Sequence, residues 1–152
     1  MTTIFSIQDH AHCAEFVGAW VHLRMALWPD ATEQEHRAEI AEQLAEPLRY
    51  GAFVVMRAGQ PAGLAEVALR RDYVNGTDTS PVAFLEGIYV TASHLRTGVA
   101  RILLDAVREW ARSHRCAELA SDTGLDNIVS QAAHQALGFT ETERVVFYRM
   151  LL

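Results

Sequence analysis

Two features of the stretch FLEGIYVTASHLRTGVARILL, residues 84–104, are able to do chemistry. Glu86 is the one charge in the apolar run VAFLEGIYV, and a carboxylate in such a run is almost never buried without a partner. A short polar loop with Thr97, Gly98 and Ala100 follows, and then a helical pattern. A carboxylate can take a proton, and the N–H groups that begin a helix can hold a phosphate. The stretch thus combines a candidate base with a candidate anion site.

The loop has the small residues that an anion-binding turn needs. Gly98 and Ala100 lack bulk, so the backbone can approach a large anion such as a pyrophosphate, and Arg96 and Arg101 add positive charge at the flanks. The loop is neither a Walker loop nor a Rossmann fingerprint. An ordinary strand–helix turn remains the alternative, because glycine-containing turns are common.

Hydrophobic periodicity predicts the elements that position this stretch. The strands expected are residues 4–8, two antiparallel strands within 50–71 joined by a turn at 58–60, then 82–90, 116–123 and a terminal strand at 141–151. The helices expected are 9–27, one from Thr32 to before Pro47 with Glu35 as capping-box partner, 98–114, and 126–137 with Asp126 as N-cap and Gly138 as terminator. The fold class is α/β (mixed α+β), a central mixed sheet flanked on both faces by about four helices, in the order β-α-α-β-β-β-α-β-α-β.

Composition limits the class of protein. The 152 residues suit a single domain spanning 1–152, and no apolar run approaches the roughly 20 residues that cross a bilayer. The net charge of −6 argues against a nucleic-acid partner and suits a cationic one. No signal peptide is indicated, and Cys13 and Cys116 lack metal or CxxC spacing, so we expect reduced thiols in the cytoplasm. No metal site is expected, since His10 and His12 form only a lone pair of possible ligands.

Several motifs together resemble one family. HLRTGVARILL after LEGIYV, with NIVSQAAHQALGF further on, resembles the GNAT superfamily of acetyl-CoA-dependent N-acetyltransferases. RMALWPD, EVALRRDYVNGTDTSPVAFLEGIYV, ELASDTGLDN and ALGFTETERVVFYR extend the similarity to its aminoglycoside 6′-N-acetyltransferases, from Arg24 to Arg149. The resemblance implies the GNAT fold, acetyl-CoA as donor co-substrate, and transfer of its acetyl group to the 6′-amine of aminoglycoside antibiotics, which confers resistance. It also implies a homodimer.

The resemblance assigns residues to the donor side. Backbone groups of Ile88, Tyr89 and Val90 would pair with the amides of pantetheine, as an added strand does. The phosphate loop would comprise Arg96, Thr97, Gly98, Val99, Ala100 and Arg101. Asn127 would contact the cofactor arm, although it also suits a helix cap. Leu95 stands where the motif has Gln or Arg; because backbone N–H groups hold the pyrophosphate, we expect binding to survive with altered affinity.

The acceptor side must hold a polycation, so it needs carboxylates and aromatic walls. The resemblance assigns Trp28, Tyr73, Glu86, Asp122 and Glu143 to this side, although Trp28, Tyr73 and Glu143 also suit a helix end, a loop anchor and an exposed strand. Glu86 would act as the base, directly or through one water. Asp122 would bind and orient a second ammonium group.

The departing thiolate is the other group that needs a proton. Many members of the superfamily provide a tyrosine as general acid, and here that position is His134, which also suits packing against the cofactor. A thiolate can also leave without a protein acid.

Two other functions fit the same motifs. One is acetylation of another small amine such as a polyamine, which would need neither Trp28 nor the loop DYVNGTDTSP. The other is a non-catalytic acetyl-CoA-binding module, which would have no use for Glu86.

Overall fold

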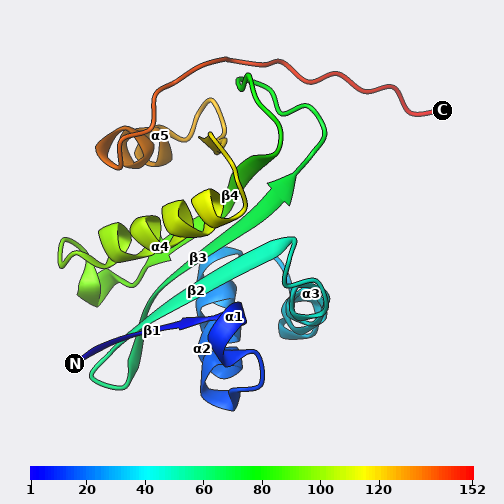
Figure 1. The fold of residues 1–152 in the computed structure, drawn as a ribbon. Helices are drawn as coiled ribbons and strands as arrows, with labels where there is room; N and C mark the ends of the chain where they lie inside the picture. The colour runs from blue at the N-terminus through cyan, green and yellow to red at the C-terminus, as the bar shows by residue number, and fades with distance from the viewer.

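The computed structural model describes residues 1–152 as a five-stranded sheet with helices on both faces (Figure 1). The strands are β1 (Thr2–Ser6), β2 (Tyr50–Arg57), β3 (Gln60–Arg70), β4 (Val82–Val90) and β5 (Leu119–Ala120), and they lie side by side in this order. All neighbours are antiparallel except β4 and β5, which are parallel. The predicted mixed sheet is therefore confirmed.

The helices are α1 (Ile7–His10), α2 (Ala14–Leu27), α3 (Glu33–Ala45), α4 (Val99–Ser113) and α5 (Ile128–Ala136), with a 3-10 turn η1 (Ala92–His94). Helix α4 covers one face of the sheet, and α1, α2 and α3 lie on the other (Figure 1). Each face has its own apolar core. Val55, Leu85, Leu103 and Trp110 belong to the core under α4, whereas Phe16, Trp20, Ile40 and Val54 belong to the opposite one.

Local signals explain most boundaries. Ser6 ends β1 because its hydroxyl accepts a hydrogen bond from the Asp9 N–H and caps α1, so the helix predicted over 9–27 is divided in two. Thr32 and Glu35 form the predicted capping box of α3. The hairpin between β2 and β3 turns through Ala58 and Gly59, both with positive φ.

The C-terminal segment, residues 140–152, corrects one prediction. It forms no strand and runs extended and exposed past the β3–β4 loop, away from the body of the chain (red in Figure 1). Its alternating pattern favours extended backbone, but a strand also needs a paired edge. The sheet of this chain ends at β5, which is two residues long and pairs only with β4. Apart from the division of the first helix into α1 and α2, the order of the elements up to α5 agrees with the prediction.

Candidate active site

A β-bulge places Glu86 apart from the rest of β4. Across the β3–β4 ladder, Glu66 lies opposite Gly87 and Val67 lies opposite Leu85, so Glu86 is left without a partner. Such a bulge re-aims a side chain out of the regular pattern of the sheet. The Glu86 side chain is 37% exposed rather than buried, and its Oε1 lies 2.9 Å from Nη2 of Arg70. The carboxylate therefore faces solvent in the middle of a central strand.

The other edge of β4 is open beyond the bulge. Strand β5 pairs only with Ala83 and Phe84, so the following residues, including Ile88 to Val90, have no strand on that side. Open N–H and C=O groups on such an edge can pair with an extended ligand that carries amides. The edge thus fits the predicted position of the pantetheine chain.

The phosphate loop has the geometry that the small residues predicted. Arg96 and Gly98 adopt positive φ values of 59° and 88°, and α4 begins directly after Gly98. The first hydrogen bond of the helix runs from the Ile102 N–H to the Gly98 carbonyl, which leaves the N–H groups of residues 99–101 free. A Cβ at Gly98 would meet nothing within 4 Å, so the space beside this residue is open. These features fit the phosphates of coenzyme A.

Two further residues belong to the donor side: Arg57 contacts the phosphate loop, and Asn127 directly precedes α5. Arg57 of β2, which sequence analysis missed, donates a hydrogen bond of 2.8 Å from Nη2 to the Thr97 carbonyl. Asn127 caps α5, its Oδ1 accepting from the Ser130 N–H at 3.1 Å, and its side chain is otherwise exposed. The cap role of Asn127 is compatible with a contact to the cofactor arm. The N-cap is thus Asn127 and not Asp126 as the sequence predicted.

Two clefts meet at Glu86. The Tyr73 cleft, of about 740 Å³, is lined by Leu48, Arg49, Tyr50, Ala68, Leu69, Arg70, Arg71, Asp72, Tyr73 and Glu86. The Trp28 cleft, of about 540 Å³, is lined by Arg24, Trp28, Ala31, His36, Glu39, Glu42, Gln43, Tyr50, Glu66, Val67 and Glu86. Arginines dominate the charges of the Tyr73 cleft, whereas glutamates dominate those of the Trp28 cleft. A polycation therefore suits the Trp28 cleft better.

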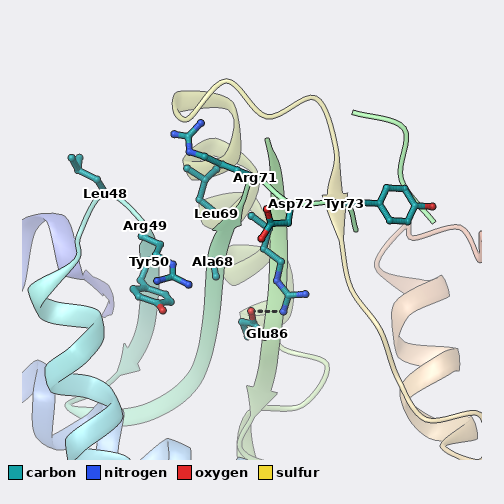
Figure 2. A pocket seen from close by; sticks show the side chains of 10 residues that line it. Leu48, Arg49, Tyr50, Ala68, Leu69, Arg71, Asp72, Tyr73 and Glu86 are labelled. Carbon is teal, nitrogen blue, oxygen red and sulfur yellow. Dashed lines mark hydrogen bonds and ion pairs between the residues drawn. The ribbon is translucent and has the colours of Figure 1, made fainter. Parts of the chain in front are cut away.

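Not every predicted acceptor residue lies in these clefts. Tyr73 is 78% exposed, and Figure 2 shows its ring pointing away from Glu86. Asp122 is exposed and lies outside both linings, but Phe84 pairs with Ala120, and extending this register places Asp122 at the level of Glu86. Glu143 is exposed in the C-terminal segment and lies next to Gly76.

His134 of α5 is linked to β4 through Ser121, a neighbour that sequence analysis did not select. Its Nδ1 is 2.7 Å from the Ser130 carbonyl, to which it donates, so Nε2 accepts from the Ser121 hydroxyl at 2.8 Å. Ser121 Oγ also lies 3.3 Å from the Leu85 carbonyl, directly before the bulge. Ser121 thus connects His134 with the strand that carries Glu86.

The fully buried carboxylate of the molecule is Glu66, not Glu86. Glu66 accepts hydrogen bonds from Arg24 Nη1, at 2.7 Å, and from Gln43. Burial raises the pKa of Glu66, and the Arg24 charge opposes this rise. Glu66 is the one charge in the apolar run GLAEVAL, just as Glu86 is the one charge in VAFLEGIYV. The same pattern therefore pointed to both residues, but sequence analysis selected only Glu86.

No helix of the structure combines the length and the apolar character needed to cross a membrane. No cluster of three or more His, Cys, Asp or Glu side chains has the arrangement of a metal site.

Comparison with known proteins identifies the class. The model of the acetyltransferase (GNAT) family matches residues 15–139, and the chain belongs to this family. It is an acetyltransferase with the GNAT fold. An aminoglycoside N(6′)-acetyltransferase type 1 of Serratia marcescens is 54% identical over 135 residues, covering 88% of this chain and 92% of the relative. The protein of the same name from Salmonella typhimurium is 47% identical over 130 residues, covering 86% and 89%.

A solved structure agrees with these relatives. The structure of AAC(6′)-Iy in complex with the bisubstrate analogue CoA-S-monomethyl-acetylneamine superimposes with a TM-score of 0.88 at 42% sequence identity. It covers 100% of this chain and 99% of that chain. The resemblance drawn from the sequence motifs is thereby confirmed.

Proposed function

We propose that this protein transfers the acetyl group of acetyl-CoA to the 6′-amine of aminoglycoside antibiotics, by direct attack in a ternary complex, and thereby confers resistance. The names of relatives that are 47–54% identical over most of the chain support this substrate. The observation in the structure that carries the proposal is the position of Glu86. The bulge leaves this carboxylate at the junction of the acidic Trp28 cleft and the open edge of β4.

The chemistry needs a base, because an alkyl ammonium group titrates near pH 10 and is not nucleophilic at neutral pH. Glu86 takes the proton from the 6′-ammonium, directly or through one water. The amine lone pair then forms the new C–N bond at the thioester carbonyl, the C–S bond breaks as the thiolate leaves, and the second amine proton is released to water. A positioned base of this kind contributes about 10²–10⁴ in rate.

Acetyl-CoA supplies the acetyl group as a thioester. Backbone groups of Ile88, Tyr89 and Val90 hold its pantetheine chain at the open edge, and Asn127 contacts the same arm. Residues 96–101 hold the pyrophosphate at the start of α4. Leu95 is exposed and therefore does not block this loop.

The acceptor is held by charge and by an aromatic wall. Trp28 lines the acidic cleft beside Glu86, and Asp122, at the level of Glu86 on the next strand, binds and orients a second substrate ammonium. Tyr73 and Glu143 contribute at the outer rim, because both side chains are exposed near the β3–β4 loop.

His134 provides the proton for the thiolate by way of Ser121. In the structure Nε2 of His134 accepts from Ser121, so this nitrogen must first gain a proton; it then donates to Ser121, whose hydroxyl proton passes to the sulfur.

The experiment is a thiol-release assay with acetyl-CoA and kanamycin, tobramycin or spermidine. Turnover with the two drugs alone, reduced at least about a hundredfold by Glu86→Gln, is the expected result. Glu109→Gln, on the exposed side of α4, is the matched control and leaves turnover unchanged. Acetylation of spermidine alone would favour a polyamine acceptor. Tight acetyl-CoA binding without turnover of any amine would favour a non-catalytic module.

We also propose that the protein acts as a homodimer in the cytoplasm. Apolar side chains of the C-terminal segment are at least 42% exposed, namely Val145, Val146, Phe147, Tyr148, Met150, Leu151 and Leu152. Such a surface suits burial against a second copy. Both cysteines are free, which suits a reducing compartment. Sedimentation equilibrium of the wild type and of a Val146→Asp, Tyr148→Asp double variant tests the dimer: dissociation in the variant is expected, and a monomeric wild type would contradict it.

A further inference from the structure

Trp28 lies directly on the backbone of β4, next to Glu86. A Cβ added at Gly87 would come within 2.6 Å of Cζ2 and 2.9 Å of Cη2 of Trp28, and within 2.9 Å of Cδ2 of Leu27. Real Cβ atoms do not approach that closely, so the indole, with Leu27 beside it, occupies the space that any larger residue at position 87 would need. The absence of a side chain at Gly87 therefore sets how close the aromatic wall stands to the carboxylate.

Both backbone groups of Trp28 are also held in place. Its N–H donates to the Arg24 carbonyl at 2.8 Å, and its carbonyl lies 3.0 Å from Nε2 of His36. The Arg24 Nε–H donates to Nδ1 of His36 at 3.2 Å, so the proton of the neutral imidazole is on Nε2 and points at the Trp28 carbonyl. Arg24 thus determines which nitrogen of His36 can hold Trp28.

The Arg24 guanidinium holds the ring as well as the backbone. Its Cζ lies 4.8 Å from the centroid of the Trp28 ring, within the range of a cation–π contact. The Arg24 side chain is only 4% exposed. It forms a salt bridge with the buried Glu66 and a second one with Glu39. Glu66 in turn belongs to the bulge, since it lies opposite Gly87. Trp28 is therefore connected to the bulge twice, through Gly87 and through the Arg24–Glu66 pair.

We propose that Arg24 and Gly87 are positioning residues that set acceptor specificity by fixing the Trp28 indole against the β4 bulge. The inference rests on the proposed role of Trp28 as a wall of the acceptor cleft. Neither residue needs to touch the drug for this effect. Arg24 fixes the orientation of the ring and Gly87 fixes its depth, so a change at either residue alters the width of the cleft beside Glu86. Affinity for the amine should change while affinity for acetyl-CoA does not.

The test combines kinetics with a direct probe of the ring. Gly87→Ala is expected to raise the KM for tobramycin about tenfold or more and to leave the KM for acetyl-CoA within about twofold. Gly51→Ala is the matched control: its Cβ would come within 2.8 Å of Cγ1 of Val67 and 2.9 Å of Nε1 of Trp110, and both side chains belong to the core under α4. We expect this control to lower the thermal midpoint of unfolding without changing either KM.

A double-mutant cycle shows whether Gly87 acts through Trp28. A Trp28→Phe background removes the indole atoms that meet Gly87 and keeps the Leu27 contact. In this background Gly87→Ala is expected to change the tobramycin KM by less than about threefold. If the full effect of Gly87→Ala persists in that background, or if Gly51→Ala gives the same selective change, the proposal is wrong.

Arg24→Lys keeps the buried charge beside Glu66 but loses the planar fork that reaches His36 and the indole. With three tryptophans, the ¹⁵N-labelled protein gives three indole N–H resonances, and Trp28→Phe identifies the one from Trp28. We expect Arg24→Lys to shift or broaden this resonance and to raise the tobramycin KM selectively. An unmoved resonance would overturn the role of Arg24.

The outcomes separate this proposal from the proposed function. A wild-type KM for tobramycin in Trp28→Phe would overturn the specificity role and leave acetyl transfer intact. If the wild type does not acetylate aminoglycosides, the proposed function fails. The resonance experiment then still decides whether Arg24 holds the ring.

Discussion

Nη2 of Arg70 lies 2.9 Å from Oε1 of Glu86, and its guanidinium carbon lies 3.6 Å from the centroid of the Phe84 ring. A cation of the protein, which lines the Tyr73 cleft, is thus already paired with the proposed base. The substrate must compete with Arg70 for the proposed base.

Arg70→Gln should therefore lower the KM for tobramycin. Exposed ion pairs are worth about 0.2–1 kcal/mol, so a decrease of up to about fivefold is expected, with kcat little changed. Initial rates at varied tobramycin measure it. Arg71→Gln is the control, because Arg71 lines the same cleft and makes no ion pair. A higher KM in Arg70→Gln would mean that Arg70 assists binding.

Gly98→Ala should weaken the donor side selectively. The residue has φ = 88°, where a side chain costs about 1–2 kcal/mol, so the loop would relax away from the geometry that presents its N–H groups. We expect a severalfold higher KM for acetyl-CoA and an unchanged KM for tobramycin. Gly59→Ala is the matched control, with φ = 75° and an equally open Cβ position in the β2–β3 hairpin. It should lose similar stability in thermal unfolding without any change in the KM for acetyl-CoA.

His134→Ala should lower activity. If His134 donates through Ser121, kcat of the variant at neutral pH drops about a hundredfold. His114→Ala is the control, because His114, at the end of α4, also places its Nδ1 2.8 Å from a carbonyl four residues earlier in the helix, that of Trp110, and lies outside both clefts. An unchanged kcat in His134→Ala would reduce the role of His134 to packing against Phe139.

The ionised carboxylate of Glu118 should stabilise the fold at neutral pH, and this contribution should be lost in acid. Hydrogen bonds from the Thr79 hydroxyl and from the N–H groups of Asp78 and Thr79 lower its pKa below the ordinary 4.5. A carboxyl whose folded pKa is depressed adds stability above its unfolded pKa and loses it as pH falls through the folded value. Glu118→Gln should therefore melt at a lower temperature than the wild type at pH 7, and the difference should shrink below about pH 4.5. A pH-independent difference would show that the charge does not matter.

Local patterns were sufficient to predict most elements of the fold. The Thr32–Glu35 capping box, the turn at Ala58 and Gly59, and the start of α4 at Gly98 each depend on neighbours within a few residues, and the structure has all three. The terminal strand was wrong for this chain because extended propensity does not provide a partner edge. Motif resemblance, rather than periodicity, identified the family.

The site was predicted less completely, because its contacts join distant residues. Arg70 and Glu86 are 16 positions apart, and Arg24 and Glu66 are 42 apart, so no spacing rule connects them. The sequence singled out Glu86 but did not predict how it is exposed, because the bulge that exposes it appears only when β3 and β4 are paired. Glu39 and Glu42 form the acidic wall of the Trp28 cleft. In the sequence their charges could not be told from those of an ordinary solvent-exposed helix face.

The bulge has a consequence for engineering. Glu86 is the single residue of β4 without an opposite number, so deleting it would join Leu85 to Gly87 and restore an unbroken antiparallel ladder with Glu66 and Val67. Every later side chain of the strand would keep its present face. The shortened chain should withstand heat better than the natural one and acetylate at least about a hundredfold more slowly, because regular sheet pairing and an available base are mutually exclusive at this position.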